Sequence, residues 1–247
     1  MRWLIFLILC LVTSCYPTTG ALAAEEAPEV VAARKARDHA SVAELQKLVA
    51  AAEKAAEEKQ NLEAYLRLAL FNVWLCEAIE SQQDDKLFKQ AAEAGVAAAE
   101  KAVALDPNSS DAHQLLGDLL SQLIPHVYGG GMRYGKRATD ELERAIELNP
   151  KNINAYVSRA ISYYYSPDSF GGSKPKAFEL LQKAVEIDPA QDAPHIWLAI
   201  FYLDAGQMDN AQREINLALS ADPERAFTQF VNSQITAAKK PATHKKL

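Results

Sequence analysis

Glycine is scarce in this sequence, with 10 residues among 247, and cysteine occurs only three times. Runs of β-branched residues are also few, whereas long stretches are rich in Ala, Leu, Glu and Lys. Strong helix formers at this density argue against a sheet protein. We therefore expect an all-α chain.

An excess of basic residues is also missing, since 26 Lys and Arg stand against 32 Asp and Glu, which gives a net charge of −6. The segment 239–247 carries four lysines and no acid, so the rest of the chain is at −10 (−6 minus +4). Phosphate would be repelled by that body, which excludes nucleic acid as the expected partner. The basic tail itself, residues 239–247, is expected to be disordered.

Residues 1–24 resemble an export signal, which would be removed from the mature protein. Arg2 precedes an apolar run, residues 3–12, which is too short to cross a bilayer, and residues 21–23 form an A-x-A cleavage site. Residues 12–15 offer a rival site that resembles a bacterial lipobox, in which Cys15 would be lipidated. Both alternatives predict an exported protein, either periplasmic or held in the bacterial envelope by a lipid anchor, the only membrane attachment expected.

Cleavage after Ala23 would leave Cys76 as the only cysteine, which excludes an internal disulfide. Cys76 lies in an apolar helical stretch, so we expect a small buried side chain rather than a reactive one.

Amphipathic helical patterns recur along the chain in pairs, and each pair ends at an Asp-Pro or Asn-Pro. The prolines, at 107, 150, 189 and 223, are 43, 39 and 34 residues apart. We expect a linker with N-terminal helices (25–60), a solenoid (61–223) and a capping helix (224–238). The solenoid divides into four units: 61–107, 110–150, 153–189 and 192–223. The surplus over 34 residues is expected in the turn between the two helices of a unit, so the inserted loops would project from one edge.

The small and aromatic positions of the last three units resemble those of the tetratricopeptide repeat (TPR) family. They are Leu116, Gly117, Ala138, Leu142, Ala145 and Pro150, then Tyr156, Ala160, Tyr163, Ala177, Leu181, Ala184 and Pro189, then Leu198, Ala199, Tyr202, Ala211, Ile215, Ala218 and Pro223. The family's early Trp is replaced by His113, Tyr156 and His195. The resemblance implies a right-handed solenoid of helix pairs with about four repeats.

A narrower resemblance follows from the long first turn and from the sequence Ser-Pro-Asp-Ser-Phe-Gly-Gly at 166–172. These features resemble the T-component lipoproteins of tripartite ATP-independent periplasmic (TRAP) transporters. That family implies an envelope protein, sometimes trimeric, which pairs with a solute-binding protein and holds a small ligand.

No set of residues indicates catalysis. Residues 130–136 satisfy the G-x-x-x-x-G-K spacing of a phosphate-binding loop, but Arg137 follows where a Ser or Thr must hold Mg²⁺, and a helix precedes the loop where a strand is needed. His113 and Asp118 are five residues apart on a helix and do not share a face, and no Cys/His pair has metal-ligand spacing. We expect neither an enzyme nor a cofactor nor a metal.

The concave side of the solenoid is the first candidate for binding, because in the TPR family the first helix of each unit lines it. By that correspondence the lining has a polar, acidic middle between apolar and aromatic ends, and contains no Lys or Arg. The candidate groove residues are Trp74, Gln114, Asp118, Gln122, Val157, Ile161, Tyr164, Tyr165, Ile196 and Ile200. The alternative is that terminal helices fill this groove as core.

The inserted loops are the second candidate. Tyr128, Arg133 and Tyr134 in the loop 127–135, and Phe170 in the loop 167–172, are expected at one edge as a contact surface. We therefore expect a non-enzymatic binding or scaffold protein of the bacterial envelope, with a protein partner (a peptide or a solute-binding protein), a small apolar ligand or self-association. It would be an accessory subunit of solute transport. The alternative is a purely structural interaction module of an envelope assembly that has no small ligand.

Overall fold

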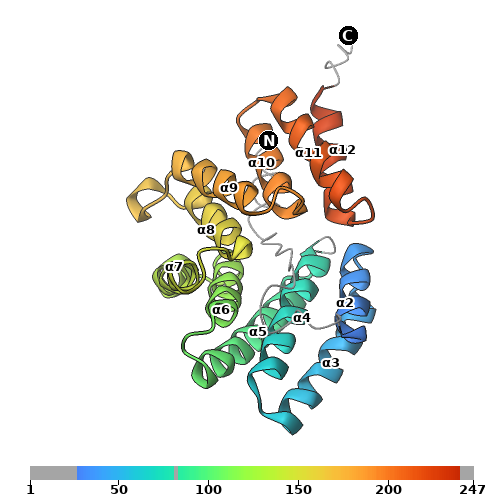
Figure 1. The fold of residues 1–247 in the computed structure, drawn as a ribbon, viewed down its shortest axis with the longest axis vertical. Coiled ribbons are helices and arrows are strands. Elements are labelled where there is room, and N and C mark those ends of the chain that lie inside the picture. The colour runs from blue at the N-terminus through green and yellow to red at the C-terminus, as the bar shows by residue number, and fades with distance from the viewer. Residues whose placement is uncertain (1–26, 81–82, 240–247) are drawn as a thin grey trace.

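The computed structural model describes residues 27–80 and 83–239. The predicted export signal with Cys15 and the tail from residue 240 lie outside the described residues. The described part holds eleven α-helices and a short 3-10 helix, and no strand, so the all-α prediction is confirmed (Figure 1). The helices are α2 (Pro28–Asp38), α3 (Val42–Lys59), α4 (Leu62–Glu80), α5 (Asp85–Leu105), α6 (Ser110–Leu123), α7 (Gly130–Leu148), α8 (Ile153–Tyr165), η1 (Asp168–Phe170), α9 (Lys174–Ile187), α10 (Asp192–Asp204), α11 (Met208–Ala221) and α12 (Ala226–Lys239).

Four helix pairs, α4/α5, α6/α7, α8/α9 and α10/α11, form the repeats, and each pair packs more extensively than any two helices from different pairs. Small residues let the paired helices approach closely. A Cβ on Gly117 of α6 would lie 2.7 Å from Cγ of Leu142 on α7. Ala160, Ala177, Ala199 and Ala211, at matching positions of the later units, are all fully buried. The TPR-type spacing of small residues is thus explained by contact distance.

The second helix of every unit ends in the same way. The residues before the four prolines, Asp106, Asn149, Asp188 and Asp222, all take an extended backbone conformation, with φ between −149° and −138°. Each side-chain oxygen accepts a hydrogen bond from the backbone N–H two residues later, at 3.0 to 3.2 Å. Asp and Asn favour such turns, and proline cannot continue the helix. One local rule therefore ends all four units.

The side chains that replace the family's early Trp contact the proline that ends the preceding unit. Nε2 of His113 lies 2.9 Å from the carbonyl oxygen of Pro107, and Nε2 of His195 lies 3.1 Å from that of Pro189. The Tyr156 hydroxyl donates to the carbonyl oxygen of Pro150 at 3.3 Å. Nδ1 of His195 also lies 2.8 Å from Oε2 of Glu214. All three side chains thus connect the preceding turn to the first helix of their unit, and His195 also contacts the second helix.

The predicted loop 127–135 is wrong for most of its length. Helix α7 begins at Gly130, so residues 130–135 form its first turns, and α7 has 19 residues where α9 and α11 have 14. Gly129 precedes it with φ +70°. A Cβ on Gly130 would lie 2.3 Å from the carbonyl oxygen of Ile124, so glycine is required by that close approach. Five (19 minus 14) of the nine (43 minus 34) surplus residues of the second unit therefore lengthen α7. Residues 130–136 are consequently not a phosphate-binding loop.

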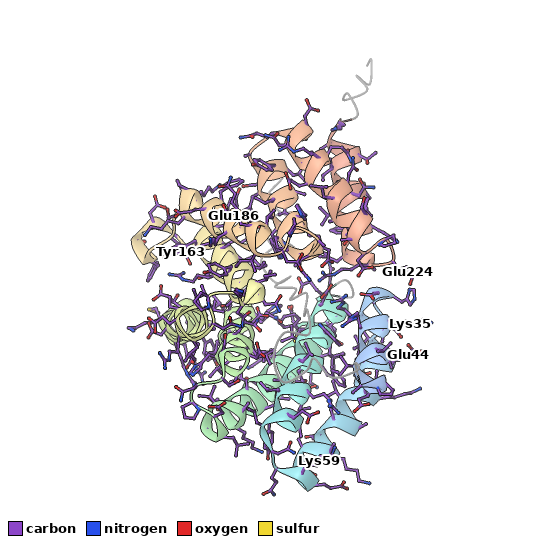
Figure 2. All side chains as sticks on the ribbon, viewed as in Figure 1. Lys35, Glu44, Lys59, Tyr163, Glu186 and Glu224 are labelled. Carbon is purple, nitrogen blue, oxygen red and sulfur yellow. The ribbon has the colours of Figure 1, made fainter. Side chains whose placement is uncertain are left out.

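The buried side chains fall into two hydrophobic clusters. The first comes from α2 to α6 with Ala138 of α7, and the second from α8 to α12. The solenoid curves so that the first and last described helices meet: α12 and the turn before it contact α2 (Figure 1). In Figure 2, Glu224 and Lys35 mark the two sides of this meeting point. Among the described residues, no helix has the length and apolar character that a membrane span requires.

Candidate functional site

The meeting point of α2 and α12 is held by a group of buried or half-buried charges that we call the closure network: Arg37, Asp38, Glu77, Asp192, Asp222 and Arg225. Arg225, in the turn before α12, is fully buried. Its Nη1 donates to Oδ2 of Asp192 at 2.6 Å, and its Nη2 donates to both carboxylate oxygens of Glu77 at 3.2 Å. One guanidinium thus joins the end of α4 to the start of α10.

A second arginine of the closure network ties α2 to the same place. Nη2 of Arg37 lies 2.5 Å from Oδ1 of Asp38 and 3.6 Å from Oδ2 of Asp222, and the guanidinium lies over the Trp74 ring at 5.4 Å from its centroid. The network thus sets two guanidinium groups among four carboxyl groups. Burial raises the pKa of Glu77, although Arg225 and Arg37 oppose the shift. Burial raises the pKa of Asp222 as well, together with the charges of Asp38 and Asp192.

The helical patterns and motifs of the sequence do not predict the closure network. Asp192 and Arg225 looked like ordinary polar residues next to turns, and Glu77 is the only charged residue between Arg67 and Glu80. That isolated carboxylate in an apolar helix was the one available signal, because a buried charge requires a partner.

The apolar part of the predicted groove is packed rather than open. Val157, Ile161, Ile196 and Ile200 are buried members of the second cluster. Trp74 belongs to the first cluster, where Arg37 of α2 covers its ring. The prediction of an open apolar groove is therefore wrong for these residues, because helices that follow each other in the chain bury the faces that the periodicity could only orient.

Tyr164 and Tyr165 also contact other helices. The Tyr164 ring stacks on Phe201 of α10 with centroids 3.7 Å apart, and its hydroxyl donates to Oδ2 of Asp204 at 2.6 Å. The Tyr165 ring meets Phe201 edge to face at 6.1 Å and is partly buried. Burial and the hydrogen bond to Asp204 raise the pKa of Tyr164, so its hydroxyl stays protonated. Tyr164 belongs to the core between α8 and α10 and not to a free surface.

The polar residues of the predicted groove, on α6, are buried as well. Gln114, Asp118 and Gln122 follow one side of α6 and are all at most 1% exposed. Neither the amide nitrogen nor the amide oxygen of Gln114 has a hydrogen-bond partner. On α8 the same is true of Oδ1 of Asn154 and Oγ of Ser158. Buried polar groups are normally paired with protein or with ordered water, so these atoms need a partner other than the described side chains.

The second candidate surface, which we call the outer edge, consists of Tyr128, Met132 and Phe170. Their side chains are 106%, 84% and 72% exposed, the three largest values among the exposed apolar residues. Tyr128 precedes α7, Met132 lies in its first turn, and Phe170 ends η1. Of the other predicted loop residues, Arg133 is exposed with its guanidinium 5.1 Å from the Tyr134 ring centroid. Tyr134 packs against the first cluster, because α7 carries it inward, and it is not part of the outer edge.

Contacts between neighbouring units join their turns in two places. The ring of His126 stacks on Phe88 at 4.0 Å, and its Nδ1 lies 3.1 Å from Oδ1 of Asp85, which joins the turn before α7 to the start of α5. Nζ of Lys174 donates to Oδ2 of Asp204 at 3.3 Å, which joins the start of α9 to the end of α10. The turns of the first and second units are thus neighbours, and so are those of the third and fourth units.

Cys76 is fully buried, as expected. Burial raises the pKa of its thiol well above the usual range, with the charges of Asp118 and Glu80 adding to the effect. Because the thiolate is the reactive form, this side chain is inert. In the described ranges, no cluster of three or more His, Cys, Asp or Glu side chains has a geometry that would hold a metal ion.

Comparison with protein families gives two matches. Residues 32–165, more than half of the chain, match the family of regulator of microtubule dynamics proteins 1-3, and residues 175–229 match the tetratricopeptide repeat. The chain belongs to the regulator of microtubule dynamics 1-3 family. The first match runs from α2 to the end of α8, and the second from α9 into α12. The TPR prediction is confirmed, whereas the narrower resemblance to TRAP T-components is not.

Solved structures show the same fold. A TPR protein of Thermus thermophilus, TTC0263, is 19% identical, with a TM-score of 0.61 over 85% of this chain and 98% of that one. The HusA haemophore of Porphyromonas gingivalis is 24% identical, with a TM-score of 0.51 over 83% of this chain and 96% of that one. At these identities the likeness concerns the fold alone. No curated protein sequence gave a significant match.

Proposed function

We propose that this chain is a non-enzymatic scaffold of the bacterial envelope that holds a protein partner on its outer edge. The observation that carries the proposal is the exposure of Tyr128, Met132 and Phe170 in adjacent units. Large aromatic side chains and Met are enriched at the centre of protein interfaces. Most other large apolar side chains of the described residues are at least partly buried, so the exposure of these three is selective.

The chemistry of the outer edge suits a partner with a mixed surface. Basic residues, Arg133, Lys136 and Lys174, and acidic residues, Asp140 and Asp168, both lie near its apolar side chains in the chain. An apolar centre with a rim of both signs is typical of a protein interface, since rim charges steer association and select partners. The resemblance to T-components implies that this partner would be a solute-binding protein and the scaffold an accessory subunit of solute transport.

The alternative function, a purely structural module of an envelope assembly, uses the same outer edge without any small ligand. The two proposals share the partner contact and differ in whether the interior of the solenoid binds a molecule. They therefore predict the same result for the outer edge and different results for α6 and α8.

Site-specific photo-crosslinking tests the partner contact. A photoreactive residue would be placed at Met132, and at Leu217 of α11 as an exposed control outside the outer edge. We expect a defined adduct in envelope extract from position 132 and not from 217, and its loss when Tyr128→Ser and Phe170→Ser are added. Mass spectrometry of the adduct would identify a second protein or a second copy of the chain. Equal labelling from 132 and 217 would contradict the proposal.

A further inference from the structure

The unpaired polar atoms of α6 and α8 lie at the same level of the solenoid. Nδ2 of Asn152, the residue before α8, donates to Oγ of Ser110 at 2.9 Å and to Oδ1 of Asp111 at 3.3 Å. The two first helices therefore start side by side. At a rise of about 1.5 Å per residue, Gln114 lies about 6 Å beyond Ser110, and Asn154 and Ser158 lie about 3 and 9 Å beyond Asn152. Gln114 is thus between the other two in height.

Ideal helix geometry gives the directions of the three side chains. Around α6, the direction of Gln114 falls between those of Ser110 and Asp111, the two residues that contact Asn152, so it is directed toward α8. Around α8, Arg159 bonds to Glu143 of α7, and Tyr164 stacks on Phe201 of α10. The remaining side of α8 that does not face its own partner helix α9 carries Asn154 and Ser158, which are one turn apart.

These atoms are buried, uncharged and unpaired. Gln114, Asn154 and Ser158 are 1%, 5% and 2% exposed. Together they present one amide donor, two carbonyl acceptors and a hydroxyl that can do both, and none of these atoms has a hydrogen-bond partner. Leaving one such group unpaired is unfavourable, so a cluster of them calls for another molecule that completes it.

We propose that Gln114, Asn154 and Ser158 form an interior binding site for a neutral ligand that carries carboxamide groups. An amide offers an N–H to the oxygens of Gln114 and Asn154, and a C=O to Nε2 of Gln114 and the Ser158 hydroxyl. An anion is disfavoured because Asp111 and Asp118 lie on the same side of α6, and because Nη2 of Arg159 on α8 donates to Glu143 of α7. The site is independent of the partner contact at the outer edge.

The choice of a neutral ligand over a cation rests on the same atoms. A cation needs negative or purely accepting groups around it, whereas Nε2 of Gln114 is a donor that would be left facing it. An amide satisfies donor and acceptor together. The mixture of donors and acceptors therefore disfavours a cation, as the carboxylates of Asp111 and Asp118 disfavour an anion.

Nuclear magnetic resonance with three matched probes tests the site: N-acetylglycinamide (neutral), N-acetylglycine (anionic at neutral pH) and glycinamide (largely cationic). We expect saturable shifts of the Gln114 side-chain amide and of backbone signals of α6 and α8 with the neutral probe only. Gln114→Met, which keeps the shape and removes the polar atoms, should weaken binding by about tenfold, the factor that corresponds to one lost hydrogen bond. Gln212→Met, on α11, should leave binding unchanged.

Ser158→Ala provides an independent check if Gln114→Met alters the fold, and it should weaken the neutral probe several-fold. The site is rejected if the neutral probe shifts no signal of α6 or α8 at saturating concentration, or if both variants bind it as the wild type does. In that event the interior atoms hold water only. Because the outer edge is not changed, crosslinking from Met132 should be the same in both variants, so failure of this site and failure of the partner contact are distinguishable.

Discussion

Arg225 and Glu77 are 148 residues apart in the chain, yet the guanidinium of one donates to both carboxylate oxygens of the other. Glu77 lies on α4, whose buried apolar residues belong to the first hydrophobic cluster. Arg225 directly precedes α12, whose buried apolar residues belong to the second. Their contact turns an array of repeats, which would ordinarily touch only their neighbours, into a closed arrangement in which the last unit stabilises the first.

Removing the central arginine should therefore be costly. Arg225→Met leaves Glu77 and Asp192 buried without their cation, and we expect a loss of about 3–5 kcal/mol in the free energy of unfolding. Adding Glu77→Gln and Asp192→Asn to that variant should recover a large part of the loss, because no unpaired charge remains. Urea denaturation of the two variants measures both. A loss below about 1 kcal/mol for Arg225→Met would contradict a buried, paired network.

The same substitution should open the closed arrangement. We expect the distance between labels on α2 and α12 to increase and broaden in Arg225→Met, as measured by fluorescence energy transfer between residues 31 and 230, which are both exposed. Leu105→Met, at an exposed position outside the closure network, should keep the wild-type distance. An unchanged distance in Arg225→Met would mean that packing alone holds the ends together.

The pair of His195 and Glu214 should make stability depend on pH. Burial alone would lower the pKa of His195, but the hydrogen bonds to Glu214 and to the Pro189 carbonyl outweigh it, so the pKa is raised in the folded state. The resulting stability is present below about pH 6.5, the pKa of an unfolded histidine, and is lost as pH rises through the folded-state pKa. Burial would raise the pKa of Glu214, but His195 and Arg213 outweigh that and lower it. The carboxylate contribution is thus lost only below about pH 4.5.

His195→Gln should consequently cost more stability at pH 5.5 than at pH 8, that is, on either side of about pH 6.5. Thermal melts of the variant and the wild type across that range give the difference directly. His39→Gln, at an exposed side chain, is the control. A cost for His195→Gln that is equal at the two pH values would show that the histidine acts only through packing and its neutral hydrogen bonds.

Substitutions of Tyr164 test whether this residue belongs to the core or to an open groove. Because its ring stacks on Phe201 and its hydroxyl bonds to Asp204, Tyr164→Ala should cost about 3–5 kcal/mol of stability. Tyr164→Phe, which loses only the hydroxyl, should cost about 1 kcal/mol. Chemical denaturation of both variants tests the assignment. A Tyr164→Ala protein of wild-type stability would mean that Tyr164 is a surface residue and not part of the core.

Substituting alanine for each of two adjacent glycines at the start of α7 should change the stability of the protein in opposite directions. Gly130→Ala would place Cβ 2.3 Å from the carbonyl oxygen of Ile124, so the turn must deform and we expect a loss above about 2 kcal/mol. Gly131→Ala meets nothing within 4 Å and lies in the helix, so it should gain about 0.5–1 kcal/mol. Melting temperatures of the two variants, compared with the wild type, test these two stability changes. If Gly130→Ala is as stable as Gly131→Ala, residues 130–135 are a loop after all.

Local signals explain how much of this fold could be read from the sequence. The helix pairs, their ends at Asp-Pro and Asn-Pro, and the small residues at Gly117 and Ala199 all depend on neighbours within one unit. The start of α7 was missed because glycines at 129, 130, 131 and 135 suggest a turn. Only the close approach of Gly130 to Ile124 shows which of them is needed for the turn itself.

The candidate site was less accessible to such reasoning. Periodicity assigned Gln114 and Tyr164 to the first helices of their units, α6 and α8, but it could not show that Tyr164 would meet Phe201 while Gln114 would meet no partner. The closure network was missed for a related reason. The meeting of Arg225 with Glu77 depends on the curvature added up over four units, and no single unit carries that information.

The closure network also limits how this chain can evolve. Solenoids commonly grow or shrink by duplication or loss of whole repeats, because an open array accepts an extra unit at little cost. Here an added or deleted unit would move α12 away from α2 and separate Arg225 from Glu77 and Arg37 from Asp222. Lineages that keep this network are therefore expected to keep four units, and to vary instead in the lengths of the turns and of the second helices.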